Sequence, residues 1–485
     1  MPAFKTDASF LEKISIGAIG TQRVFADLND AGHQPIELER GSRSFKIWRS
    51  IKIKRIRVPD ILCVKCGTRV ESRGKTKFEV SMSHSYAEPE RAWNSGLYDQ
   101  DYVALVGVHR CGDAPVDWEA DKNVSYVQVG EMDETFREGL VKSTTPKGAQ
   151  EGFESRLIWP STIASYDGTV FAVNGASIQI KRISDNRIVS YRLGGAGIKP
   201  RVKEGDSVVQ NQIIASVITP HRSFRCDQIV AEDHFLRRLN SASVSERYAA
   251  TKALRFLPTS ERILEALTKK LNDPDEHIYV RMEAAATLAR ADRADGWDFI
   301  GQRLQDSYAT HRLEAVIILA ELDKPTSISL LQSVLSDPMQ NAEVRAGAAW
   351  SLGELGKPSS IKSLVDAFGE LEEVIRIEAA RALARFAPAY SKDLINRFGS
   401  ANTTLRPGIA WALSRKGSFS VNDLLESRKD EDSRQWISYI LGMRDSKEFI
   451  NELEALKAQD QEIYFATTVL WKIVSSWVYD LKEYG

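Results

Sequence analysis

The chain has 485 residues, of which 43% are hydrophobic and 27% charged, and its formal net charge is −1. A chain of this length is too long to fold around one hydrophobic core, so we expect two to four domains. No apolar run approaches the roughly 18 residues of a membrane span, and the N-terminus lacks the basic-then-apolar order of a secretory signal. We therefore expect a cytoplasmic protein without membrane attachment.

Positive charge is concentrated near the N-terminus. Residues 40–80 contain thirteen Lys and Arg but only three acids, a local charge of +10 that leaves −11 for the rest. Aromatic residues such as Trp48 and Phe78 are interleaved with these charges, which is typical of structured strands that bind nucleic-acid phosphate. We expect the nucleic acid to be DNA. The residues expected to contact it are Lys46, Arg49, Lys52, Lys54, Arg55, Arg57 and Lys77. The alternative is a solvated surface whose charges are neutralised elsewhere.

The first 140 residues alternate helical and strand patterns. Residues 10–32 predict a helix that ends at a glycine. The strands expected after it are residues 33–40, 45–56, 58–64, 69–83 and 101–108, with a short helix at 92–97. We expect one α/β domain over residues 1–145, with a helix against a mixed sheet.

Residues 10–108 resemble the PD-(D/E)xK nuclease superfamily, whose fold is that of restriction endonucleases. The resemblance is carried by Pro59-Asp60 and Glu71 on either side of a turn. It implies that Asp60 and Glu71 bind Mg²⁺ or Mn²⁺, with Arg73 and Lys75 completing a catalytic group. The chemistry agrees, because phosphodiester hydrolysis uses a divalent ion to activate water, and carboxylate oxygens suit such ions.

Two departures from the family pattern affect the expected activity. Arg73 stands where the family usually has lysine, and arginine cannot act as a general base, so Lys75 would have to substitute. Thr21 stands where many members have a glutamate on the first helix. An inactive domain that only binds nucleic acid therefore remains an alternative.

The stretch CVKCG, residues 63–67, has the form of a zinc knuckle. We expect Cys63 and Cys66 to bind Zn²⁺ together with Cys111, with His109 or His84 as the fourth ligand. The alternative is a pair of ordinary reduced cysteines in a turn. The four cysteines of the chain, Cys226 among them, do not suggest a disulfide framework.

Residues 153–228 show period-two strands broken by glycine, which predicts a small all-β sandwich. The stretch VKEGDSVVQNQIIA, from Val202, resembles the turn and strand of barrel-sandwich hybrid (lipoyl-like) domains. No lysine with the attachment signature of that family stands at a hairpin tip, so we expect neither lipoylation nor biotinylation.

Residues 235–485 repeat. Segments such as RMEAAATL and RIEAARAL begin with arginines at positions 247, 281, 312, 345, 376, 406 and 434, spaced 28 to 34 residues apart. A period near 30 with two helices in each unit predicts an α-solenoid. VRAGAAWSLGELG, from Val344, resembles the short bacterial form of HEAT repeats. We expect the arginines to make hydrogen bonds between repeats, with a ligand-binding ladder as the alternative, and residues 461–481 to form a capping helix.

These patterns together predict a multidomain enzyme: a Mg²⁺-dependent endonuclease whose HEAT-repeat arm binds substrate or a partner protein. Bacterial restriction or antiviral defence is the expected role. One alternative is a non-catalytic nucleic-acid-binding adaptor with a degenerate nuclease-like domain. Another is a zinc-stabilised scaffold for proteins.

Overall fold

The computed structural model of the protein describes residues 7–39, 56–112, 117–145, 155–226, 228–449 and 451–483. Over these residues the chain divides into two compact units that meet in the sequence at Thr287 and Leu288. The first unit contains the sheets and the first helices, and the second contains the later helices. In the described part of the chain, no helix is both long and apolar enough to cross a membrane.

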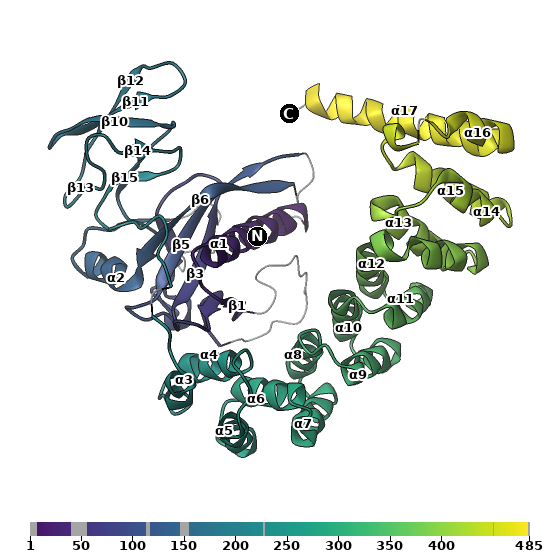
Figure 1. The fold of residues 1–485 in the computed structure, drawn as a ribbon, viewed down its shortest axis with the longest axis horizontal. Helices are drawn as coiled ribbons and strands as arrows, with labels where there is room; N and C mark the ends of the chain where they lie inside the picture. Colours follow the sequence, from purple (N-terminus) through teal and green to yellow (C-terminus); the bar gives the residue numbers. More distant parts are fainter. Residues whose placement is uncertain are drawn as a thin grey trace. The chain divides into compact units, whose positions relative to one another are not determined.

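A five-stranded sheet with one long helix forms the start of the first unit (Figure 1). Its elements are α1 (Asp7–Asp30), β1 (Pro35–Glu37), β2 (Ile61–Cys63), β3 (Arg69–Lys75), β5 (Tyr102–Arg110), β6 (Trp118–Gln128) and, after the sheet, α2 (Val129–Arg137). The strand order is β1-β2-β3-β5-β6, in which β3 and β5 are parallel and the other neighbours antiparallel. The predicted helix and mixed sheet are therefore present.

Helix α1 packs directly on β3 at a pair of glycines. A Cβ added to Gly20 would lie 3.0 Å from the Cα of Gly74, and one added to Gly74 would lie 2.5 Å from the carbonyl oxygen of Ile16. Around this contact, Val24 and Leu28 of the helix bury against Val70 of the sheet. The helix ends where Gly32 adopts a left-handed φ of +85°, as the sequence predicts.

A second layer of strands extends the first domain. Strand β4 (Ser81–His84) pairs with β8 (Ser155–Ile158), which pairs in turn with β7 (Lys142–Thr144). Trp93 and Trp159 pack edge to face beneath it, with ring centroids 5.1 Å apart. Because β8 belongs to this sheet, the predicted β module shares its first strand with the domain before it.

The β module consists of two small sheets around an apolar core. Its strands are β9 (Ser161–Ile163), β10 (Gly168–Val173), β11 (Ser177–Arg182), β12 (Ile188–Arg192), β13 (Lys199–Pro200), β14 (Ser207–Val208) and β15 (Ile213–Ser216), in the orders β12-β11-β10-β14 and β13-β15-β9. Val170, Ile180 and Ile214 bury between them. Gly205, with φ +87°, forms the predicted tight turn before β14.

Residues 219–226, here called the return segment, lead the chain back to the first sheet. His221 forms an antiparallel bridge with Tyr126 on the edge strand β6. Phe224 stacks on Tyr102 with ring centroids 4.6 Å apart. The return segment thus covers part of an edge that would otherwise expose unpaired backbone groups.

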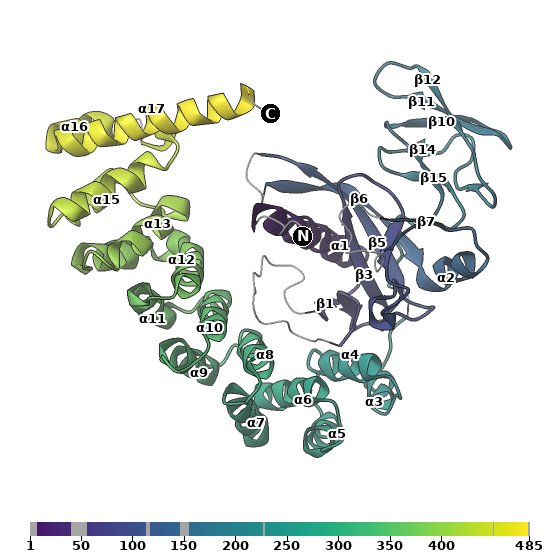
Figure 2. The same ribbon diagram turned by 180° about the vertical axis from the view of Figure 1, so that it is seen from behind.

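Paired helices form the remainder of both units. The first unit holds α3 (Glu232–Arg238), α4 (Val244–Leu254), α5 (Glu261–Asn272) and the start of α6 (Ile278–Arg290). The second holds α7 (Ala294–Leu304), α8 (Ala309–Leu319), α9 (Pro325–Ser336), α10 (Ala342–Leu355), α11 (Ile361–Asp366), α12 (Glu373–Ser400), α13 (Arg406–Lys416), α14 (Val421–Glu426), α15 (Glu431–Gly442), α16 (Leu453–Gln459) and α17 (Gln461–Glu483). Helix α12 contains Pro388 and a non-helical Tyr390, so it joins two helices across a kink. Figure 2 shows successive pairs such as α9 with α10 and α11 with α12 stacked in order, which confirms the predicted solenoid.

The seven leading arginines all make hydrogen bonds within the repeats. The Nε atoms of Arg281 and Arg345 donate to the carbonyls of Leu271 and Leu335, at the ends of the preceding helices, each over 2.9 Å. Arg406 is 2% exposed and donates to the carbonyls of Phe398 and Ala401. The others, Arg247, Arg312, Arg376 and Arg434, bond to loop carbonyls, to side chains of the next repeat, or to both. Arg247, Arg312, Arg345, Arg406 and Arg434 also contact the next repeat, as predicted. The seven side chains that a ligand-binding ladder would need are thus engaged in protein contacts.

Candidate functional site

The structure places Asp60, directly before β2, beside Glu71 on β3. Ile61 pairs with Val70 in the antiparallel ladder, so Asp60 lies opposite Glu71 and both side chains occupy one face. The Oδ2 atom of Asp60 accepts the N–H of Ser72 over 2.8 Å. Burial, together with the nearby charge of Glu71, holds the pKa of Asp60 well above its usual range. Burial also raises the pKa of Glu71.

The basic residues of this group are already engaged with protein partners. Arg73 forms an ion pair with Glu71 at 2.5 Å. Lys75 donates to the carbonyl of Ser81 at 2.5 Å and lies 3.2 Å from its Oγ atom. Burial, with the charge of Arg73, lowers the pKa of Lys75 to about 7. Asp60, Glu71 and Arg73 therefore form one cluster, while Lys75 is held further along the strand at Ser81.

Most of the predicted nucleic-acid contacts lie outside the described residues. This holds for Lys46, Arg49, Lys52, Lys54 and Arg55. Arg57 and Lys77 are described, and both are exposed.

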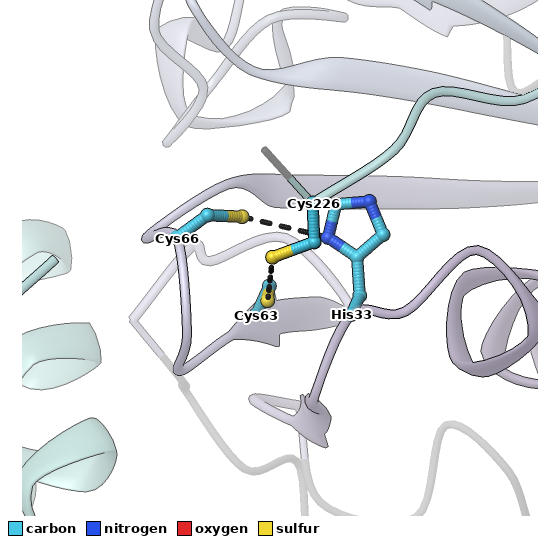
Figure 3. Close-up of side chains that lie close together, drawn as sticks. All are labelled: His33, Cys63, Cys66 and Cys226. Atoms are coloured by element: carbon cyan, nitrogen blue, oxygen red, sulfur yellow. Dashed lines mark hydrogen bonds between the residues drawn. The ribbon is translucent and has the colours of Figure 1, made fainter. Parts of the chain in front are cut away.

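A second group of side chains has the composition of a metal centre. His33, Cys63, Cys66 and Cys226 offer one nitrogen and three sulfurs that all lie within 4.8 Å of one another (Figure 3). The group draws on three places in the chain: the loop after α1, the β2–β3 turn, and the end of the return segment. Within the described parts of the chain, it is the one group of three or more His, Cys, Asp or Glu that is close enough to share an ion.

Individual distances in this group are short. The Sγ atom of Cys63 lies 3.9 Å from that of Cys226, and the Sγ atom of Cys66 lies 3.4 Å from Nδ1 of His33. The hydrogen bond from the Cys63 thiol, more than any other contact, lowers the pKa of Cys66 to about 7, whereas the same interaction and burial raise the pKa of Cys63 to about 11.

The predicted ligands Cys111 and His109 are not part of this group, and that expectation is corrected. His109 is 57% exposed and contacts Asp121 at 3.3 Å, while Cys111 is exposed beyond the end of β5. Strand β5 runs parallel to β3 with Tyr102 beside Val70, so only its beginning lies near the knuckle. At about 3.3 Å for each residue, Cys111 is roughly 30 Å further along.

The third histidine considered, His84, is also elsewhere. It is buried on β4, where its Nδ1 atom accepts the N–H of Trp93 over 3.2 Å. The members of the group that sequence reasoning missed are His33 and Cys226. The signals for them were a histidine directly after the glycine that ends α1 and a fourth cysteine without another role.

The fold defines the class of protein to which the second unit belongs. The family model for HEAT repeats matches residues 297–384, so this part of the chain consists of HEAT repeats. Among curated proteins, the chain is similar to deoxyhypusine hydroxylase of Mus musculus, with 29% identity over 126 residues, or 25% of this chain and 42% of the relative. It is also similar to deoxyhypusine hydroxylase of Rattus norvegicus, with 32% identity over 99 residues. That match covers 20% of this chain and 33% of the relative. The chain therefore spans less than half the length of these relatives.

Solved structures show only distant likeness. Human deoxyhypusine hydroxylase in complex with glycerol has a TM-score of 0.23 at 20% identity, covering 43% of this chain and 83% of that one. A computationally designed armadillo repeat protein for modular peptide recognition has a TM-score of 0.24 at 18% identity, covering 39% and 100%. At these scores neither structure adds to the assignment of the repeats.

These comparisons correct the predicted activity. The endonuclease prediction, and with it the role in restriction or antiviral defence, is wrong, because the matched family is a repeat family and the curated relatives are hydroxylases. Mg²⁺ or Mn²⁺ as cofactor is wrong on the same finding of hydroxylase relatives. Neither the nuclease-like nor the barrel-sandwich resemblance is supported by these matches.

Proposed function

We propose that this protein is a scaffold whose HEAT repeats bind a partner protein. The observation that carries the proposal is a row of exposed apolar side chains in the corresponding turns of three repeats. Tyr308, Met339 and Leu371 are 66%, 90% and 93% exposed. Each stands in the turn that leads into the second helix of its repeat, one, three and two residues before α8, α10 and α12 begin.

The corresponding turns of stacked repeats lie along one edge of a solenoid, because each repeat contacts only its neighbours with a small rotation between them. Single exposed apolar residues are common on protein surfaces, but an aligned row of them is typical of a binding surface. We call Tyr308, Met339 and Leu371 the apolar row.

The surroundings of the apolar row indicate the chemistry of the partner. Glu372 and Glu373 are exposed directly after Leu371. Neighbouring helices pack about 8–10 Å apart, so a short segment can contact several repeats. We infer that the partner presents a peptide segment with several apolar side chains and with lysine or arginine beside them.

The test uses the full-length protein. A photo-crosslinking residue at position 339 identifies the partner in cell extract, and the affinity of the purified partner is then measured. Changing all three residues of the apolar row to glutamate should weaken binding at least tenfold. Phe465→Glu is the matched control, because Phe465 is 68% exposed but lies on α17, outside the row. Equal affinity of the triple variant and the wild type would overturn the proposal.

A second candidate is the activity that the curated relatives are named for. It is favoured by 29–32% identity over about 100 residues. The matching segment is a quarter or less of this chain, and the described repeats contain no group of three or more His, Cys, Asp or Glu close enough to share an ion. Incubation with a deoxyhypusine-containing protein, ferrous iron, a reductant and O₂ tests it: an added oxygen, seen as about 16 mass units, supports this candidate, and an unchanged mass excludes it.

Nucleic acid is a further candidate partner, favoured by the charge of +10 over residues 40–80. Binding through phosphates loses affinity steeply as salt is added, because counterions are released on binding. A fluorescence assay with a DNA duplex and with an RNA of equal length, from about 50 to 200 mM salt, tests this partner. Affinity that is absent or independent of salt would exclude it.

A further inference from the structure

We propose that His33, Cys63, Cys66 and Cys226 bind one zinc ion and form a structural centre that fastens the return segment to the N-terminal sheet. The proposal concerns the first unit alone and does not rest on the partner-binding function. Its ligand set differs from the one expected from the sequence, because Cys111 and His109 are replaced by Cys226 and His33.

The spacing of the side chains matches tetrahedral zinc. With Zn–S bonds of about 2.3 Å and a Zn–N bond of about 2.0–2.1 Å, a tetrahedron separates two sulfurs by about 3.8 Å and a sulfur from a nitrogen by about 3.6 Å. The Cys63–Cys226 separation of 3.9 Å and the Cys66–His33 separation of 3.4 Å lie close to these values. All four ligand atoms lie within 4.8 Å of one another. Small side-chain rotations therefore suffice to bring them around one ion.

The contacts around the ligands orient them for a metal. Nε2 of His33 lies 2.9 Å from the carbonyl oxygen of Phe224, so the ring proton is held there and Nδ1 faces the sulfurs with its lone pair. The N–H of Gln34 points at Cys63 Sγ over 3.3 Å and is a donor that a metal-bound thiolate can accept. Gly67, with φ +77°, allows the knuckle to turn back, and its N–H donates to the Cys63 carbonyl over 2.8 Å.

The donor set selects the kind of ion. Three thiolates and one imidazole are soft to borderline ligands that suit zinc, whereas Mg²⁺ requires oxygen ligands. Four protein ligands complete the tetrahedron and leave no position for water or substrate. The centre is therefore structural, and we assign it no catalytic role.

The position of the centre explains what it stabilises. Cys226 is 163 residues from Cys63 in the sequence, so the metal closes a long loop that contains the β module. Directly after it, the N–H of Val230 donates to the carbonyl of Lys65 over 2.8 Å, and His234 on α3 packs against Gly67. The zinc-bound knuckle thus supports the start of the helical repeats within the first unit.

The first experiment measures zinc directly. Full-length protein, purified without chelator, should contain one zinc per chain by elemental analysis, and its Co²⁺ form should show the visible absorption of tetrahedral thiolate coordination. Cys226→Ser and His33→Ala should each lower zinc affinity by at least tenfold. Cys111→Ser is the matched control, since Cys111 is exposed and outside the site, and it should retain full zinc content.

A thiol titration of the wild type keeps the proposal testable even if the variants fail to fold. In the zinc form only Cys111 should react with a thiol reagent, and all four cysteines should react after chelation. Zinc well below stoichiometry, or full reactivity before chelation, would overturn the proposal. A mass two units low without reductant would also overturn it, by showing a Cys63–Cys226 disulfide instead.

Discussion

Arg69 and Asp101 form a buried ion pair that joins β3 to the start of β5. The Nε atom of Arg69 lies 3.0 Å from Oδ1 of Asp101, and the side chains are 7% and 1% exposed. The same guanidinium lies over the ring of Tyr98 and contacts Ser245 on α4 at 3.5 Å. One arginine therefore links the N-terminal sheet to the first helical repeat of the same unit.

Asp101→Ala should destabilise the first unit by about 3–5 kcal/mol, because Arg69 would remain buried without a counter-charge. Arg69→Met combined with Asp101→Leu should recover most of this loss, since apolar residues can replace a buried pair as a whole. The measurement is the shift of the first transition in urea unfolding. If Asp101→Ala were as stable as the wild type, the ion pair would not contribute to the stability of the first unit.

Asp60→Asn should stabilise the protein at neutral pH. The amide can still accept the N–H of Ser72, while the repulsion between Asp60 and Glu71 disappears. A carboxyl group whose pKa is raised on folding is stabilising at low pH and loses that contribution as pH rises above the unfolded value of 3.8. The advantage of the variant should therefore be absent near pH 3 and grow above about pH 4.

Thermal unfolding of both proteins from pH 3 to pH 8 checks this prediction. Asp275→Asn, the same change at an exposed position, is the control. A loss of stability in Asp60→Asn at neutral pH would contradict it and would show that the carboxylate is needed in its ionised form.

Lys75→Met should stabilise the protein at and below neutral pH, by an amount on the order of 2 kcal/mol. The pKa of Lys75 is about 7 in the folded protein and 10.5 when unperturbed, so the unfolded chain binds more protons between these values. The stability of the wild type should consequently rise from pH 7 to pH 10.5, and the advantage of the variant should shrink over that range.

The measurement is the free energy of unfolding of the variant minus that of the wild type, at half-unit pH steps. Lys77→Met serves as the control, because Lys77 is two residues away and exposed. A difference that stays constant from pH 7 to pH 10 would contradict a lowered pKa of Lys75.

Arg406→Ala should destabilise the second unit by about 3 kcal/mol, because it leaves buried carbonyls and the Asp430 side chain without their donor. Arg415→Ala is the matched control on the same helix, where the side chain is exposed, and it should cost less than about 0.5 kcal/mol. Calorimetry of the second unit's transition distinguishes them. Equal effects would mean that the leading arginines are not structural.

Local patterns were sufficient for the solenoid and for the acidic pair. The repeats could be predicted because each helix pair contacts only its neighbours in the sequence. The period of 28 to 34 residues is therefore enough to predict the stacking of the helix pairs. Asp60 and Glu71 could be placed together because a single hairpin joins their strands. What this pair does could not be predicted, since Arg73 and burial change its charge in ways that spacing does not reveal.

The amino-acid order alone determined that residues 63–67 form a knuckle with two cysteines, because a turn of that length is a local property. Only the folded chain decided its partners. Because β5 pairs in parallel with β3, Cys111 lies far from the knuckle. The return segment, held by a backbone bridge between His221 and Tyr126, places Cys226 beside Cys63, which is 163 residues away in the sequence. Backbone hydrogen bonds are available to almost any residue, so such a long-range pairing leaves no sequence pattern to detect.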